Sequence, residues 1–442
     1  MRRIPRSVVC VFAVLAPAAL VQAGDDSAPA HPNTPSAAGI LCDHRARIDY
    51  RRAGRPALRV ELAEPVVVAV ASKPEKWGRH QFPTLTRWDD GRLCVSWHMA
   101  EDSALAYGSA PAMAVSTDDG RTWVPYTGVP GVSGLRLPNG DRIAVVTPPS
   151  RKVSELALPE PVGARVDNYG NVQQPLYRLA DLPADLRTVY MKRLPKGGTD
   201  WLAEQARLDD PQALRYSIHG VFPVVWWGDM CVASDGSLLA GIYPGYCLRD
   251  DGTTDPNCHV FFYRSSDAGR SWQVQGRILY EPDLAADPTG EQRGGFTEPA
   301  FDILPGGLCL CVLRTTDGVG VGPMYASRSH DHGKTWSRPA AITRNGVLPR
   351  LLRLANGVLV LSAGRPGVQL RFCTDGEGNV WTDAFEMLAY TSDNDSVSCG
   401  YTALLVTGPD RFLLAYSDFE HPTEVGQVRK AIKVREIIVT PQ

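Results

Sequence analysis

The sequence lacks most features that mark a metal, nucleotide or nucleic-acid protein. It contains ten cysteines but no Cys-x-x-Cys pair and no cysteine–histidine spacing typical of zinc. Acidic and basic residues nearly balance, and no block of basic side chains occurs. This balance argues against nucleic acid or anionic lipid as a partner. No cofactor motif is present, so we expect none to be bound.

Long apolar runs are absent except at the start of the chain. There, Arg2, Arg3 and Arg6 precede the apolar residues 8–21, and Ala23 supplies the small residue that a leader peptidase requires. The run is short for a membrane span. Residues 1–23 are therefore predicted to be a signal peptide, which makes the mature protein secreted or periplasmic with no membrane span. A retained anchor is the alternative.

The segment after the predicted signal is polar. Residues 24–40 are rich in Ala, Pro, Ser and Asp, which predicts a disordered leader. Cleavage after Ala23 removes three arginines and no acidic residue, so the formal net charge of −2 becomes −5. Residues 41–442 are predicted to form one domain, because a repeat runs through them.

Nine cysteines follow the predicted signal. Cys247 and Cys258 flank a stretch rich in Asp, Gly and Pro, where a disulfide could clip a loop. Cys94, Cys309 and Cys311 lie in apolar segments and are predicted to be buried free thiols.

A short turn, usually with glycine, precedes an apolar strand six times along the chain. Such turns tolerate positive φ and predict β-hairpins. The six turns are Asp89-Asp90-Gly91, Pro138-Asn139-Gly140, Ser234-Asp235-Gly236, Pro305-Gly306-Gly307, Ala355-Asn356-Gly357 and Pro409-Asp410. Their spacing is about fifty residues, which is typical of a propeller blade of several short strands.

Six hairpins therefore predict an all-β, six-bladed propeller in which each sheet covers its neighbour. The wide gap before the third turn predicts an insertion at about residues 150–215. Residues 65–70 and 431–439 read as strands before the first blade and after the last. Pairing them in one sheet would close the ring and remove two exposed edges.

A second motif, Ser-x-Asp-x-Gly-x-Thr-Trp, accompanies the hairpins. It occurs at residues 116–123 and 329–336, at 265–272 with Ser in place of Thr, and in a worn form at 374–381. The Asp can bond turn amides, the Gly supplies positive φ, and the Trp packs between blades. We interpret these motifs as structural and distant from the propeller axis.

Three intact motifs, one worn copy and six predicted blades resemble the sialidase (neuraminidase) superfamily, in which the motif is called the Asp-box. The resemblance covers roughly residues 65–440. It implies cleavage of terminal sialic acid with retention of configuration. It also implies three arginines on the sugar carboxylate, an Asp acid/base, and a Tyr nucleophile assisted by a Glu. A neutral phenol suits this reaction because the sugar carboxylate would repel an anionic nucleophile.

The resemblance assigns these roles by position. Tyr401, just before the last hairpin, matches the nucleophile, and Glu298, before the fourth, matches its partner. Arg314 matches the second arginine, and Arg365, before the worn motif, matches the third.

The remaining positions are less regular. Asp102, in the loop before the first motif, matches the acid/base, and Glu101 beside it is the alternative. The first arginine is replaced by Gln81, which loses a charge-assisted bond of roughly 1.5–3 kcal/mol. Arg79 would face the same way as Gln81 in a regular strand and is the candidate substitute. His98 is a further candidate for the site.

The sequence thus predicts a secreted retaining exo-glycosidase of sialidase type, acting on terminal sialic acid or a similar acidic sugar of a glycan or glycoconjugate. Because Gln81 departs from the pattern, a glycosidase or lyase acting on a uronate or deoxysugar is the first alternative. A carbohydrate-binding propeller without activity is the second.

Overall fold

The computed structural model describes residues 39–166, 172–316, 319–391 and 396–442. The predicted signal peptide and residues 24–38 of the predicted leader lie outside these ranges. The described chain is built of strands and short 3-10 helices, and none of its helices is long and apolar enough to span a membrane. Ile40 already belongs to β1 (Ile40–Leu41), which pairs with β29 (Phe385–Glu386), so the leader ends earlier than predicted.

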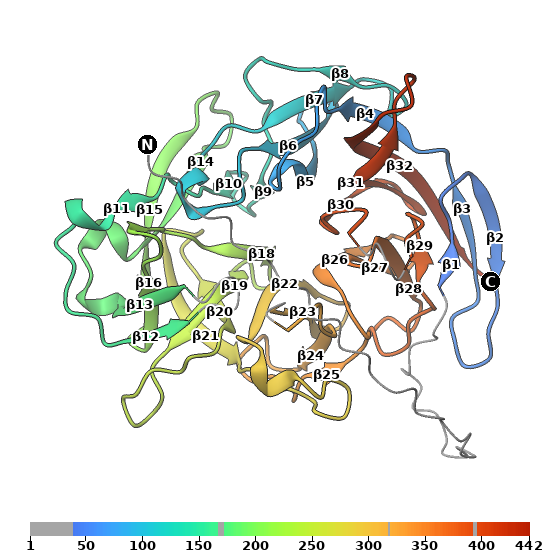
Figure 1. The fold of residues 1–442 in the computed structure, drawn as a ribbon. Coiled ribbons are helices and arrows are strands. Elements are labelled where there is room, and N and C mark those ends of the chain that lie inside the picture. Colours follow the sequence, from blue (N-terminus) through green and yellow to red (C-terminus); the bar gives the residue numbers. More distant parts are fainter. Residues whose placement is uncertain (1–38, 167–171, 317–318, 392–395) are drawn as a thin grey trace, which may run out of the picture. The chain divides into compact units, whose positions relative to one another are not determined.

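In the described residues, six four-stranded blades lie in a ring, with the first strands nearest its centre (Figure 1). The fold is the predicted β-propeller. Blade 1 consists of β5 (Arg79–Arg87), β6 (Leu93–Met99), β7 (Ala112–Ser116) and β8 (Val124–Pro125), and blade 2 of β9 (Leu135–Arg136), β10 (Arg142–Val145), β14 (Thr188–Leu194) and β15 (Leu202–Asp209). Blade 3 consists of β18 (Trp227–Val232), β19 (Leu238–Cys247), β20 (His259–Ser265) and β21 (Ser271–Ile278), and blade 4 of β22 (Phe296–Ile303), β23 (Cys309–Thr315), β24 (Tyr325–Ser329) and β25 (Ala340–Ala341). Blade 5 consists of β26 (Val347–Arg353), β27 (Leu359–Gly364), β28 (Val368–Cys373) and β29, and blade 6 of β30 (Thr402–Gly408), β31 (Arg411–Pro422), β32 (Val428–Pro441) and β4 (Val66–Val70).

Each predicted turn joins the first and second strands of a blade. The Asp-boxes join third and fourth strands, and antiparallel pairing brings both kinds of turn to one end of the blades. We call this the repeat end. In the box of blade 4, Asp331 accepts bonds from the Thr335 amide at 2.9 Å and hydroxyl at 2.6 Å. The Trp336 indole donates to the Gly333 carbonyl at 3.1 Å.

The two sequence repeats interlock between neighbouring blades. A Cβ atom added at the box glycine would lie against the second strand of the preceding blade in all four boxes. The pairs are Gly120 with Leu413, Gly269 with Ile143, Gly333 with Leu239, and Gly378 with Leu310. The box glycine is therefore needed for close approach as well as for its positive φ.

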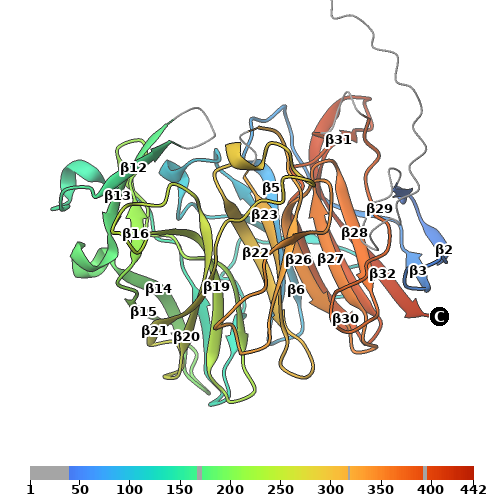
Figure 2. The same cartoon turned by 90° about the horizontal axis from the view of Figure 1, so that it is seen from below.

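The predicted insertion at 150–215 is only partly an insertion. Its β14 and β15 are the third and fourth strands of blade 2, and β15 also pairs in parallel with β21 of blade 3. The added elements are β11 (Arg151–Lys152), β12 (Gly163–Val166), β13 (Gln173–Arg178), β16 (Ala213–Tyr216) and β17 (Val221–Phe222). β12, β13 and β16 lie at one edge of the ring in both views (Figures 1 and 2).

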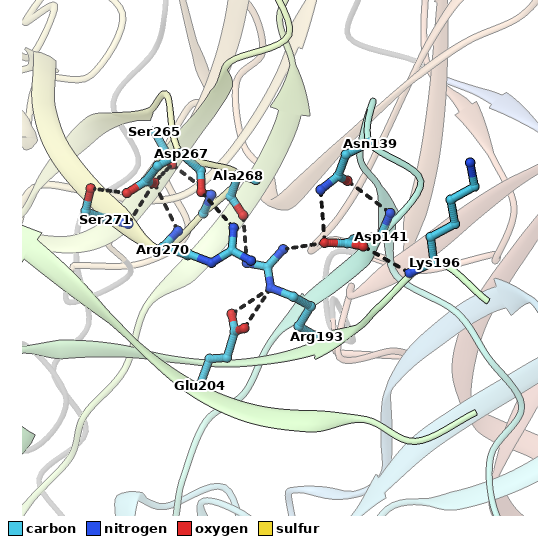
Figure 3. A network of polar contacts seen from close by, with 11 residues as sticks. Asn139, Asp141, Arg193, Lys196, Glu204, Ser265, Asp267, Ala268, Arg270 and Ser271 are labelled. Carbon is cyan, nitrogen blue, oxygen red and sulfur yellow. Dashed lines mark hydrogen bonds and ion pairs between the residues drawn. The ribbon is translucent and has the colours of Figure 1, made fainter. Parts of the chain in front are cut away.

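A buried arginine joins blade 2, which has no box, to the box of blade 3 (Figure 3). Arg193, 2% exposed, donates from Nε to Glu204 at 2.7 Å and from Nη2 to the Ala268 carbonyl at 2.8 Å. Its Nη1 reaches Asp141 at 3.3 Å. The guanidinium is thus paired with two carboxylates of blade 2 and hydrogen-bonded to a carbonyl of blade 3, so its buried charge is compensated.

The ring closes as predicted, with β4 and β32 paired through Val70 and Ala431. β3 (Leu58–Leu62) and β2 (Ala46–Tyr50) extend this sheet at the edge opposite β12 (Figure 2). Arg435 is fully buried and donates to the carbonyls of Ala63, Cys42 and His44. One side chain thereby ties the N-terminal strands to the last blade.

The cysteines are free thiols throughout the described residues. Cys94, Cys309 and Cys311 are buried, as predicted, whereas the Cys247–Cys258 disulfide suggested by the sequence is not formed. Asp255 organises that loop instead. Burial opposes its charge, but the nearby His259 side chain and a hydrogen bond from the Asn257 amide lower the pKa of Asp255 to about 2.

Candidate active site

The structure brings Tyr401, Glu298 and Arg314 together from two blades. Tyr401, just before β30, donates its hydroxyl to Oε1 of Glu298 in β22. Arg314, near the end of β23, donates from Nη1 to Glu298 Oε2 at 2.6 Å and to the Tyr401 oxygen at 3.0 Å. Glu298 and Arg314 are buried. The three lie at strand ends opposite the hairpins, an end of the propeller that we call the site end.

A bulge turns Glu298 toward this cluster. The pairing of β22 with β23 shifts register between Thr297 and Ala300, and Glu298 has φ 48°. A bulge interrupts the alternation of a strand and redirects a side chain. In blade 5, Leu348 has φ 40° within a similar shift, and its amide donates to Glu298 Oε2 at 3.0 Å.

The surroundings of Tyr401 keep its phenol neutral. Burial raises the pKa of Tyr401 well above its usual value, and the charge of Glu298 raises it further, while Arg314 and Arg365 oppose this. The phenol therefore enters any reaction with its proton, already directed at a carboxylate. Loss of that proton to Glu298 would turn Tyr401 into a nucleophile next to an arginine.

Arg365 lies between Tyr401 and an exposed tryptophan. It follows β27, and its Nε donates to the Cys399 carbonyl at 3.0 Å. Its guanidinium carbon is 5.8 Å from the centre of the Tyr401 ring and 5.2 Å from that of Trp77. Two of the three predicted arginine positions thus lie beside the tyrosine.

Aromatic side chains connect Asp102 with the cluster of Tyr401, Glu298 and Arg314. Trp77 donates its indole N–H to Asp102 Oδ2 at 3.0 Å. The Trp77 ring contacts Phe82 at 6.4 Å between centroids, and Phe82 contacts Tyr401 at 4.7 Å. Glu101, the alternative acid/base, forms an exposed ion pair with Lys76 at 3.0 Å, and this contact lowers its pKa. The arrangement favours Asp102.

Gln81 and Arg79 do not face the same way. β5 shifts register against β6 between Arg79 and Gln81, and again before Thr84. Gln81 is fully buried, whereas Arg79 is exposed. The expectation that Arg79 stands beside Gln81 is wrong, because these bulges break the alternation. His98, the further candidate, hydrogen-bonds the Gly78 carbonyl through Nδ1 at 2.9 Å.

Sequence reasoning missed several aromatic residues around the site. Trp77 and Phe82 belong to no recognised motif. Tyr107, Trp227 and Tyr243 form a row with centroid spacings of 5.2 and 5.5 Å. Burial raises the pKa of Tyr243 well above its usual value, and the charge of Glu298 raises it further. In the sequence, the Trp226-Trp227 pair is open to two interpretations, stacking on a sugar or packing between blades, and packing is the preferred one.

The described residues contain no group of three or more His, Cys, Asp or Glu side chains arranged to hold a metal ion.

Comparisons with known proteins support the fold. The family profile of the BNR/Asp-box repeat matches residues 327–338, around the box of blade 4. No curated protein is significantly similar in sequence. A solved structure of a protein of unknown function from Dyadobacter fermentans is similar over 86% of this chain and 99% of its own. Its TM-score is 0.56 and its sequence identity 19%, so the likeness concerns the fold alone.

Two enzymes of known activity are more distant in structure. An alpha-L-arabinanase from Penicillium chrysogenum has a TM-score of 0.44 and 15% identity, over 84% of this chain and 98% of its own. A Trypanosoma rangeli sialidase has a TM-score of 0.42 and 15% identity, over 88% of this chain and 59% of its own. These scores carry no argument about activity. The box repeat and the ring of six blades define an Asp-box β-propeller.

Proposed function

We propose that the protein is a retaining exo-glycosidase of sialidase type that removes a terminal acidic sugar from a glycan, with sialic acid as the first candidate. One observation carries the proposal: the Tyr401 hydroxyl lies between a buried carboxylate, Glu298, and a buried guanidinium, Arg314. A purely structural tyrosine does not need a base and a cation on the same oxygen.

The reaction would proceed in two displacements. In the first, Tyr401 attacks the anomeric carbon and passes its proton to Glu298, while Asp102 protonates the departing glycosidic oxygen. In the second, Asp102 takes a proton from water, which attacks the same carbon, and the phenolate recovers its proton from Glu298. Each group returns to its starting state, and two inversions give retention. Arg314 and Arg365 would hold the sugar carboxylate.

Hydrolysis of a 4-methylumbelliferyl sialoside by the purified protein tests this proposal. Proton NMR of the first product should show the retained anomer. Tyr401→Phe should abolish turnover, whereas Tyr126→Phe, in blade 1 near the Gly91 turn, should not. Hydrolysis that survives Tyr401→Phe undiminished would rule out the mechanism.

The buried Gln81 favours a second candidate, a glycosidase or lyase that acts on another sugar such as a uronate or deoxysugar. Its carboxamide faces the protein interior and offers no cation to a carboxylate. A panel of plant, algal and mucin glycans, read out as released monosaccharide or 4,5-unsaturated ends, separates the candidates. Saturable glycan binding without turnover, unchanged in Asp102→Ala, would instead indicate a binding protein.

A further inference from the structure

The segment before β5 is fastened to the loop that carries Asp102. Lys76 pairs with Glu101 at 3.0 Å, and the Trp77 indole donates to Asp102 at 3.0 Å. Between these contacts the backbones touch, because a Cβ atom at Gly78 would lie 2.4 Å from the Asp102 nitrogen. Three consecutive residues therefore fix the position of the Asp102 loop.

The same segment is also held by the buried side chain of Gln81 and by the partly buried side chains of His98 and Lys430. The Gly78 amide donates to Oε1 of Gln81 at 2.5 Å, and His98 Nδ1 donates to the Gly78 carbonyl at 2.9 Å. Lys430 of β32 donates to the Lys76 carbonyl at 2.7 Å. Gln81 is thus engaged by backbone rather than exposed to a ligand.

Contacts on the Trp77 ring set its orientation. Arg365 lies 5.2 Å from its centre, and Phe82 and Phe419 meet it edge-on at 6.4 and 5.9 Å. The ring is nevertheless 42% exposed at the site end. An indole nitrogen can only donate, so its bond to Asp102 Oδ2 favours Oδ1 as the oxygen that carries the proton.

We propose that Trp77 is the positioning residue for Asp102, and that Gln81 serves this positioning through Gly78 in place of binding a sugar carboxylate. The inference rests on the proposed function, in which Asp102 is the acid/base. Trp77 selects the oxygen of Asp102 that carries the proton and holds it toward the leaving group. Arg365 is then the cation that the Trp77 ring and Tyr401 hold between them.

Leaving-group dependence tests this role. A sugar alkoxide needs protonation to depart, whereas an aryl leaving group departs largely without it. Trp77→Phe keeps a ring but removes the N–H. We expect kcat/KM to fall roughly 10-fold or more on sialyllactose and less than about 3-fold on the 4-methylumbelliferyl sialoside. Equal losses on both substrates would overturn the inference.

A matched control makes the same chemical change at the repeat end. Trp123 donates its indole N–H to the Gly120 carbonyl at 3.1 Å in the box of blade 1. Trp123→Phe should show no leaving-group dependence. If it reproduces the pattern of Trp77→Phe, the effect is general loosening and the inference fails.

An NMR titration tests the contact without requiring turnover. The indole N–H resonance of Trp77, assigned by its loss in Trp77→Phe, should shift with pH as Asp102 titrates and should stop shifting in Asp102→Asn. If the pH dependence of the Trp77 indole resonance were the same in the wild type and in Asp102→Asn, the inference would be wrong even for an active enzyme. A titrating resonance in a protein that hydrolyses no glycoside would uphold the contact and reject the proposed function.

Discussion

The two ends of the propeller hold their side chains in different ways. At the repeat end, Asp331 accepts bonds from Thr335, four positions away in one motif. At the site end, Tyr401 donates to Glu298 across 103 positions, and Leu348 reaches the same carboxylate across 50. A box can form wherever its motif occurs, whereas the site exists only when blades 4, 5 and 6 are in place. Changes at the repeat end should therefore lower stability and leave activity unchanged, whereas changes at the site end should remove activity.

The largest effect is expected for Arg314→Met at the site end. The change leaves the buried Glu298 carboxylate without the ion pair it now makes at 2.6 Å. Breaking a buried pair from one side costs about 3–5 kcal/mol. We expect urea unfolding to show a loss of this size, together with loss of glycoside hydrolysis.

A double variant is the control for Arg314→Met. Glu298→Gln combined with Arg314→Met removes both charges and should recover part of the stability but none of the activity. A single variant within about 1 kcal/mol of the wild type would contradict the view that this pair is shielded from water.

Arg193→Met makes the same change at the repeat end. Arg193 is as buried as Arg314, but its partner Glu204 is about a quarter exposed and can regain water. We expect a smaller loss, about 2–3 kcal/mol by urea unfolding, and unchanged kcat/KM. If Arg193→Met lowered kcat/KM without lowering stability, the repeat end would act directly on the site, which would contradict this comparison.

The comparison also explains which features the sequence could predict. The hairpins, the boxes and the closing strand were predictable because each depends on a local signal, such as a glycine with positive φ or a carboxylate beside turn amides. The bounds of the insertion at 150–215 were wrong because blade 2 has no box to mark β14 and β15.

Residues of the candidate site could be predicted only where their position relative to a blade's hairpin marks them. The resemblance to the sialidase superfamily, applied at positions relative to the hairpins, predicted Tyr401, Glu298 and Arg314, and the structure brings these three side chains together. The prediction that Arg79 faces the same way as Gln81 was wrong because the two register shifts in β5 cannot be recognised from the alternation of side chains along the sequence. Trp77 was missed because its contact with Asp102 spans 25 positions and lies outside any motif.

Two glycine substitutions should measure how much the contact between a box glycine and the preceding blade contributes to stability. Gly357 has φ +87° with open space around its Cβ position, whereas Gly378 has φ +73° with a Leu310 carbon at 2.5 Å. Gly357→Ala should cost only the backbone strain, about 1 kcal/mol. Gly378→Ala should add overpacking against blade 4 and cost about 2–4 kcal/mol in total by urea unfolding. Equal costs would show that the blade contact is loose.

The smallest effect is expected from the pH dependence of a single box. Hydrogen bonds from the Thr122 hydroxyl and then its amide lower the pKa of Asp118 to about 2. A carboxyl group with a pKa lowered by folding stabilises the fold above its unfolded pKa of about 4 and loses that contribution as the pH falls toward its folded pKa. The advantage of wild type over Asp118→Asn should therefore shrink between pH 4 and about 2. Thermal unfolding of both proteins across this range measures it, and a constant difference would mean that the box gains nothing from the charge of its aspartate.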